Sequence, residues 1–174
     1  GDAQYLAGLI ADERKITKSD LQHWVEKASW HMVSDYAVAW VAAESAFGWE
    51  LALEWIESPD EDIASAGWST LGSLVSIKPD AELDLPALSA LLDRVARDIH
   101  GAQNRVRYNM NGFVIAVGGA VAPLSEQAMK IAQKIGQVSV DVGGTACKVP
   151  FAPEYIGKIV EMGRVGHKRK MARC

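Results

Sequence analysis

The segment Gln103–Gly119, "QNRVRYNMNGFVIAVGG", changes from polar to apolar at its midpoint. The apolar half, Phe113–Val117, has the composition of a buried helix. The polar half places four side chains at the spacing i, i+3, i+4 and i+7, which is one helix face: Asn104, Arg107, Tyr108 and Asn111. Asparagine is a poor residue for a helix interior, so contacts outside the helix must stabilise this half. We predict a helix with polar contacts in its first turns and core packing in its last.

Helical spacing of apolar residues continues through most of the chain and predicts about eight or nine helices. Capping and proline signals indicate four helix starts, at Ser19 with Gln22, at Ser58 with Pro59 and Glu61, near Pro86 and near Ser125. The segment Gln137–Gly144, "QVSVDVGG", alternates like a short strand. Because no second strand could pair with it, we predict a loop there.

The fold class predicted from this pattern is all-α. Helix pairs recur about every 35–45 residues, which favours an α-α superhelix of HEAT-like or armadillo-like repeats. A compact irregular bundle is the alternative. In a superhelix, one helix of each pair lines a concave surface, and we expect function there.

Composition favours one domain over residues 1–174, since 49% of the residues are hydrophobic. Cys147 and Cys174 form no C-x-x-C motif, and the histidines do not cluster, so we predict no disulfide framework, no metal site and no cofactor. Without a membrane-length apolar run or a signal peptide, we expect a cytoplasmic protein. Gly1 meets no helix start signal and an apolar-periodic segment follows almost at once, so an N-terminal piece is expected to be lacking.

Charge is distributed unevenly along the chain. Residues 1–103 hold 7 basic and 18 acidic side chains, whereas residues 104–174 hold 11 basic and 4 acidic ones, a net charge of +7. The C-terminal part is therefore the part that could bind an anion. The basic tail, residues 164–174, either contributes to that binding or is a solvated end.

Three local patterns are candidates for function. Arg105 and Arg107 could bind phosphate together with Tyr108 and Asn111, or could form a structural network with acids of the preceding helix such as Asp93 or Asp98.

In the second pattern, Ser29–Tyr36, His31 and Asp35 stand four residues apart beside Trp30. This group could stabilise a developing cation or orient a water molecule. Alternatively, His31 and Asp35 form an ordinary surface pair and Trp30 packs in the core. In the third pattern, Gly143, Gly144 and Thr145 with Lys148 form either an anion nest or a tight loop with Lys148 in solvent.

Several segments together resemble the AlkD-like DNA alkylation repair proteins, and the match covers nearly the whole chain. The joint occurrence of "NRVRYNMNGFVIAVG" and "TACKVP" is its most specific part. The resemblance implies a superhelix of HEAT-like repeats with a basic concave cleft that holds duplex DNA. It also implies metal-independent hydrolysis of the N-glycosidic bond of alkylated purines. Because family chains usually begin further upstream than Gly1, the resemblance implies that an N-terminal helix pair is lacking.

Carried over by position, the resemblance places Asp35 on the family's catalytic aspartate and His31 where the family has a tryptophan, with Trp30 adjacent. Phe113 stands on a second family tryptophan. Ser65 and Ala116 stand where the family has DNA-gripping arginines, so this chain lacks both.

These observations lead to two functional hypotheses. One is an alkylpurine DNA glycosylase that uses Asp35, Trp30 and His31, since the reaction needs an anion near the sugar cation. The other is a HEAT-like module that binds nucleic acid or protein without chemistry. Where the ligand is DNA, we expect a duplex to be held through its phosphates, with no membrane contact, by Arg105, Arg107, Tyr108, Asn111, Phe113, Lys148, Lys168, Arg169 and Lys170.

Overall fold

The computed structural model describes residues 1–173, and every regular element in that range is helical. The elements are α1 (Asp2–Ile10), α2 (Lys18–Glu26), the π-helix η1 (Val33–Val38), α3 (Ala39–Glu44), α4 (Gly48–Trp55), α5 (Glu61–Ile77), η2 (Asp80–Glu82), α6 (Leu85–Asp98), η3 (Ile99–Gly101), α7 (Asn104–Ala120), η4 (Ala122–Leu124), α8 (Ser125–Ile135) and α9 (Ala152–Glu161). The all-α prediction is confirmed, and "QVSVDVGG" is a loop. Cys174, the last residue of the predicted basic tail, lies outside the described residues.

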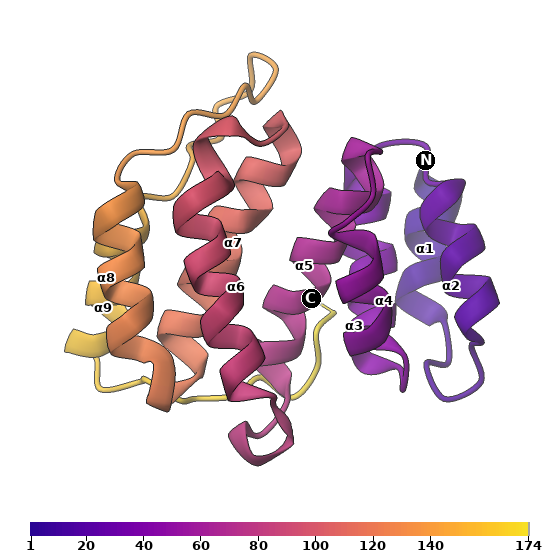
Figure 1. Ribbon diagram of the computed structural model, residues 1–174. Coiled ribbons are helices and arrows are strands. Elements are labelled where there is room, and N and C mark those ends of the chain that lie inside the picture. Colours follow the sequence, from indigo (N-terminus) through magenta and orange to yellow (C-terminus); the bar gives the residue numbers. More distant parts are fainter. Residues whose placement is uncertain (174) are drawn as a thin grey trace.

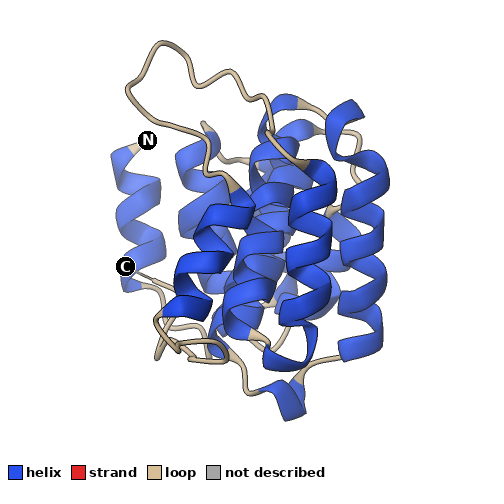
Figure 2. Ribbon diagram, turned by 90° about the vertical axis from the view of Figure 1, so that its left-hand side faces the viewer, coloured by secondary structure: helices blue, strands red, loops and turns tan. Residues whose placement is uncertain are grey.

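The helices form two rows, seen from the front in Figure 1 and from the side in Figure 2. One row, here the A row, contains α2, α4, α6 and α8. The other, the B row, contains α1, η1 with α3, α5, α7 and α9, and each member contacts the next along the row. Packing between successive neighbours is the arrangement of a helical-repeat superhelix.

The largest core cluster lies around α5 and α7, the two helices with the most extensive mutual contact. Trp68 of α5 meets Phe113 of α7 edge to face, with ring centroids 5.3 Å apart, and both side chains are buried. The apolar half of the Gln103–Gly119 segment therefore packs as predicted. The assignment of Phe113 as a DNA contact stays a prediction, and in this structure its ring is buried against Trp68 of α5.

Two predicted helix starts are displaced by the observed caps. Thr17, rather than Ser19, caps α2, and its hydroxyl accepts from the Asp20 backbone N–H at 3.1 Å. Asp60, rather than Ser58, caps α5 by accepting from two backbone N–H groups. Thr and Asp, like Ser, can accept hydrogen bonds from the free N–H groups of a first helical turn. The residue types alone therefore did not decide which of two candidates, two residues apart, caps each helix.

The basic tail does not extend into solvent. Its backbone and two of its cations contact the C-terminal ends of B-row helices, for example through the Gly166 N–H, which donates to the Gly119 carbonyl oxygen of α7 at 2.9 Å. The expectation of a solvated basic end is therefore wrong for the described part of the tail.

Helices α4 and α5 approach so closely that Gly67 has no room for a side chain. A Cβ atom at Gly67 would lie 2.8 Å from the backbone nitrogen of Ile56. We predict that Gly67→Ala lowers the free energy of unfolding by about 1–3 kcal/mol, because backbone must move.

Gly112→Ala is the matched control, since a Cβ atom at that exposed position of α7 would meet nothing within 4 Å. It should raise stability by about 0.5–1 kcal/mol through helix propensity. Urea unfolding of both variants checks the pair, and equal effects would contradict the close packing.

Candidate functional site

Polar residues of three B-row helices meet in one group, here named the Asp35 cluster: Asp35 of η1, Ser65 of α5, and Arg105, Tyr108 and Asn109 of α7. The Arg105 guanidinium donates to Asp35 Oδ2 from Nη2 at 3.0 Å and from Nε at 3.3 Å. Asn109 Nδ2 donates to Ser65 Oγ at 2.7 Å. The ion pair joins residues 70 positions apart in the sequence.

Asp35 lies within the π-helix η1, whose wider turn is a feature often found at functional sites. Its side chain is 1% exposed. The Ser69 hydroxyl of α5 also donates to the Asp35 backbone carbonyl, which fixes η1 against α5. The carboxylate thus points into protein rather than toward an open surface.

The predicted pair of His31 and Asp35 is not formed in the part of the chain that the structure describes. The ring of His31 instead contacts Trp30 edge to face, with centroids 5.5 Å apart. Trp30 is 46% exposed, so it does not pack in the core as the structural alternative supposed. Neither reading of this pattern anticipated Arg105 as the partner of Asp35.

Burial raises the pKa of Asp35 above its ordinary value, and hydrogen bonds from Ser65 and Arg105 oppose that shift. The cost of removing the carboxylate from water therefore exceeds the attraction of Arg105, which is common for buried ion pairs. The ion pair of Asp35 and Arg105 is accordingly weak evidence for stability.

Arg105 is held on a second side by Tyr108, whose ring centroid lies 4.5 Å from the guanidinium carbon. Its backbone N–H donates to Glu61 Oε1 at 2.6 Å, which places a carboxylate at the N-terminus of α7. The role of Arg105 in phosphate binding stays a prediction, and in this structure the guanidinium is bonded to Asp35. The alternative of a structural network is correct, but with Asp35 as partner instead of Asp93 or Asp98.

The asparagines of α7 hold the long loop between α8 and α9. Asn104 exchanges two hydrogen bonds with the backbone of Asp141, at 2.8 and 2.7 Å. Asn111 Nδ2 donates to the Pro150 carbonyl oxygen at 2.8 Å, and its side chain is buried. These contacts explain why a helix tolerates several asparagines. The predicted ligand contact of Asn111 stays a prediction, and its side chain is buried here.

Arg107 lies on the same face of α7, between these two anchors. Among the described residues, Arg107 Nε and the neighbouring Asn111 Oδ1 are buried without a hydrogen-bond partner. No acidic side chain pairs with the guanidinium within that range either. Of the two arginines in the patch, Arg107 is the one whose charge is not neutralised by a protein partner.

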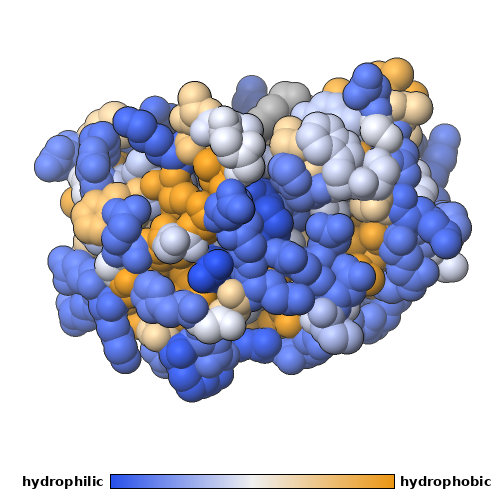
Figure 3. All heavy atoms as spheres, turned by 90° about the horizontal axis from the view of Figure 1, so that it is seen from above, coloured by the Kyte–Doolittle hydropathy of each residue, from blue (hydrophilic) through white to orange (hydrophobic). Residues whose placement is uncertain are grey.

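The remaining predicted DNA contacts lie apart from the Asp35 cluster. Lys148 is exposed on the long loop, beside Gly143 and Gly144, which both have positive φ. That loop lies at the upper end of the molecule in Figure 1, and the view from that end in Figure 3 shows hydrophilic and hydrophobic side chains next to one another. In the tail, Lys168 Nζ is engaged by the Val75 carbonyl oxygen and by Asp80, whereas Lys170 is exposed.

Two kinds of site find no support within residues 1–173. No group of three or more metal-ligating side chains could hold a metal ion. No single helix in that range is long and apolar enough to cross a membrane, although the bent pair Asn104–Ala120 and Ala122–Ile135 meets the requirement by length and composition.

Sequence reasoning missed the contributions of Ser69 and Glu61 and the link between Ser65 and Asn109. These are common polar residues of helices, and their spacing in the sequence does not indicate which residues they contact. Only the approach of α5 to η1 and α7 gives them partners.

The raised pKa of Asp35 predicts the sign of a pH effect. When the pKa of a carboxyl group is higher in the folded state than in the unfolded state, the folded protein loses stability as the pH rises from the unfolded-state pKa through the folded-state pKa. We predict that Asp35→Asn is at least as stable as the natural chain at pH 7 and loses this advantage toward pH 4. Urea unfolding between these pH values checks it. A loss of about 3–5 kcal/mol at pH 7 would show instead that the attraction of Arg105 outweighs burial.

Comparison with known proteins relates this architecture to others. No family model matches the chain. The chain is 33% identical over 159 residues to uncharacterized protein Lmo0209 of Listeria monocytogenes and 32% identical over 159 residues to uncharacterized protein Lin0241 of Listeria innocua. Each alignment covers 90% of this chain and 67% of the relative.

A solved structure shares the fold over 99% of this chain and 74% of its own, with a TM-score of 0.91 and 37% sequence identity. It is described as "a new family of proteins related to the HEAT-like repeat DNA glycosylases with affinity for branched DNA structures". With this identity and coverage, the chain belongs to that family of proteins related to the HEAT-like repeat DNA glycosylases.

Proposed function

We propose that this protein binds DNA through its phosphates, with a preference for branched over straight duplex DNA, and carries out no base excision. The preference is drawn from the structural neighbour described as having affinity for branched DNA. The observation that carries the absence of excision is the ion pair of Asp35 with Arg105.

Excision of an alkylated purine requires an anion close to the developing sugar cation and a positioned water molecule. Asp35 is the carboxylate that the resemblance puts in this role, but its side chain is 1% exposed and bonded to Arg105. A guanidinium in direct contact reduces the negative field that a sugar cation would experience. Ser65 and Ala116 also replace the two arginines that would hold DNA phosphates, and neither can replace such contacts.

Phosphate binding then depends on cations without an acidic protein partner. Arg107 on α7 and Lys148 on the long loop meet this description within residues 1–173, and both belong to the positively charged C-terminal part. Arg107 Nε is a hydrogen-bond donor that lacks an acceptor in the folded chain. Nε itself is buried, so a phosphate would meet the guanidinium from the solvent side of this partly exposed side chain, where it would supply an opposite charge.

We predict that Arg107→Ala and Lys148→Ala each weaken binding of a four-way DNA junction. Each removed phosphate contact should reduce the slope of log K against log salt by about 0.9. Lys130→Ala is the matched control, because Lys130 on the A-row helix α8 is exposed and paired with Glu126. Fluorescence anisotropy at several salt concentrations, with the junction and a duplex of equal length, measures both effects. Binding that is absent at low salt, or insensitive to it, would disprove the proposal.

Alkylpurine excision is the second candidate, favoured by the placement of Asp35 on the family's catalytic aspartate. We predict that the natural chain releases no more 7-methylguanine or 3-methyladenine from methylated DNA than Asp35→Asn does. If Asp35 were catalytic, the substitution should instead reduce release by about 100- to 1000-fold. Such a reduction, with DNA affinity unchanged, would establish the enzyme hypothesis.

A further inference from the structure

The C-terminal tail, residues 164–173, passes the C-terminal ends of successive B-row helices. After Gly166 contacts α7, the Arg169 backbone N–H donates to the Ser76 carbonyl oxygen of α5 at 2.8 Å, and Lys168 Nζ donates to the Val75 carbonyl oxygen at 2.9 Å. The Ala172 backbone N–H then donates to Glu44 Oε1 of α3 at 2.7 Å. The tail thereby provides partners for carbonyl groups that a helix end leaves free.

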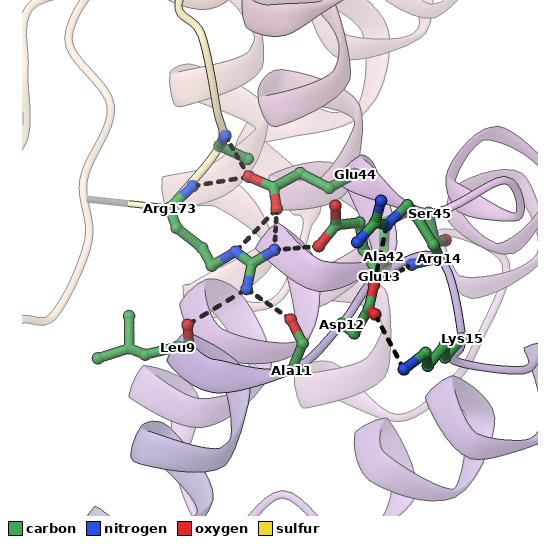
Figure 4. A network of polar contacts seen from close by, with 11 residues as sticks. Leu9, Ala11, Asp12, Glu13, Arg14, Lys15, Ala42, Glu44, Ser45 and Arg173 are labelled. Carbon is green, nitrogen blue, oxygen red and sulfur yellow. Dashed lines mark hydrogen bonds and ion pairs between the residues drawn. The ribbon is translucent and has the colours of Figure 1, made fainter.

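The tail ends in a cluster around Arg173, shown in Figure 4. Arg173 Nε donates to Glu44 Oε2 at 2.7 Å, and Nη2 donates to Glu13 Oε2 at 2.6 Å and also to Glu44. Nη1 donates to the carbonyl oxygens of Leu9 and Ala11, at 3.2 and 2.8 Å, at the C-terminal end of α1. One side chain therefore joins the last described residues to the first helix, and both Arg173 and Glu44 are mostly buried, at 15% and 10% exposed.

These contacts depart from the rule for helical repeats. In a superhelix each repeat contacts only its neighbours, so curvature follows from small rotations between neighbours and is easily altered. The tail instead connects α9 to α7, α5, α3 and α1. Because the tail contacts each of these helices, it resists changes in the curvature of the superhelix that contacts between neighbouring helices alone would allow.

The attachment of the tail is mainly polar. Ala172 is the single fully buried residue between 164 and 173, where it packs near Trp40 and Leu74. The apolar area that holds the tail is therefore small. Loss of the Arg173 contacts leaves the Glu44 carboxylate largely buried without its main partner, which is costly.

The tail also forms a wall of two cavities along the B row. One, of about 260 Å³, lies between Ala116 of α7, Ile159 of α9 and Arg164 of the tail. The other, of about 850 Å³, lies between Glu13, Ile77 of α5 and Arg173. The position of the tail thus determines the shape of this side of the molecule.

We propose that the tail is a clasp that fixes the curvature of the superhelix, closed by Arg173 against Glu44, Glu13 and the end of α1. Because it acts within the chain, the clasp is independent of whether the protein binds DNA. Its release lets α1 and α3 move relative to α7 and α9 and widens the B-row side.

The test compares Arg173→Ala with Lys170→Ala, a matched loss of one positive charge from an exposed position three residues away. In Arg173→Ala, amide hydrogen exchange in α1 and in residues 164–173 should become at least about tenfold faster, since local opening governs exchange. Small-angle X-ray scattering should show an increased radius of gyration. Lys170→Ala should match the natural chain in both measurements, and circular dichroism should show that each variant remains helical.

Equal exchange and equal radius in Arg173→Ala and Lys170→Ala would overturn the proposal. If Arg173→Ala does not fold, Glu44→Gln, which keeps the size of the side chain and removes its charge, takes its place with the same two readouts. The natural chain provides a further measurement, because salt weakens ion pairs. Exchange in α1 should rise between 0.1 and 1 M NaCl more than exchange in α8, and an equal rise would contradict an ionic clasp.

Discussion

The contact between α5 and α7 determines where the other elements lie. Trp68 and Phe113 form its centre, and small residues allow the helices to approach, with Gly72 of α5 facing Ala116 of α7. This packing brings the polar N-terminal half of α7 beside Ser65 and within reach of η1. The Asp35 cluster, the anchoring of the long loop and the attachment of the tail all follow from the position of these two helices.

The ion pair of Asp35 and Arg105 connects fold to function. In an excision enzyme of this architecture, a carboxylate would face a cationic sugar. Here the Asp35 carboxylate instead accepts hydrogen bonds from the Arg105 guanidinium of α7. The raised pKa of Asp35 indicates that burial costs more than the pair returns. The hydrogen bonds of the cluster link η1 to α7 and α7 to α5.

Part of the positive charge in the C-terminal part is neutralised within the molecule. Arg105, Lys168 and Arg173 have carboxylate partners inside the molecule. Arg107 and Lys148 have none within residues 1–173. A count of basic residues consequently overstates the charge offered to a nucleic acid.

The sequence by itself determined the all-α fold and the burial of the apolar half of α7, because apolar periodicity depends only on local spacing. It also located the Gln103–Gly119 segment as the place where polar contacts concentrate. It did not determine that Arg105 meets Asp35, that Asn104 and Asn111 hold a loop, or that Arg173 reaches Glu44. Each of these partners lies between 37 and 129 residues away, so only the packing of the helices could decide which groups meet. Hydrogen bonds act over about 3 Å, and no sequence spacing specifies such a distance between helices that are brought together by their cores.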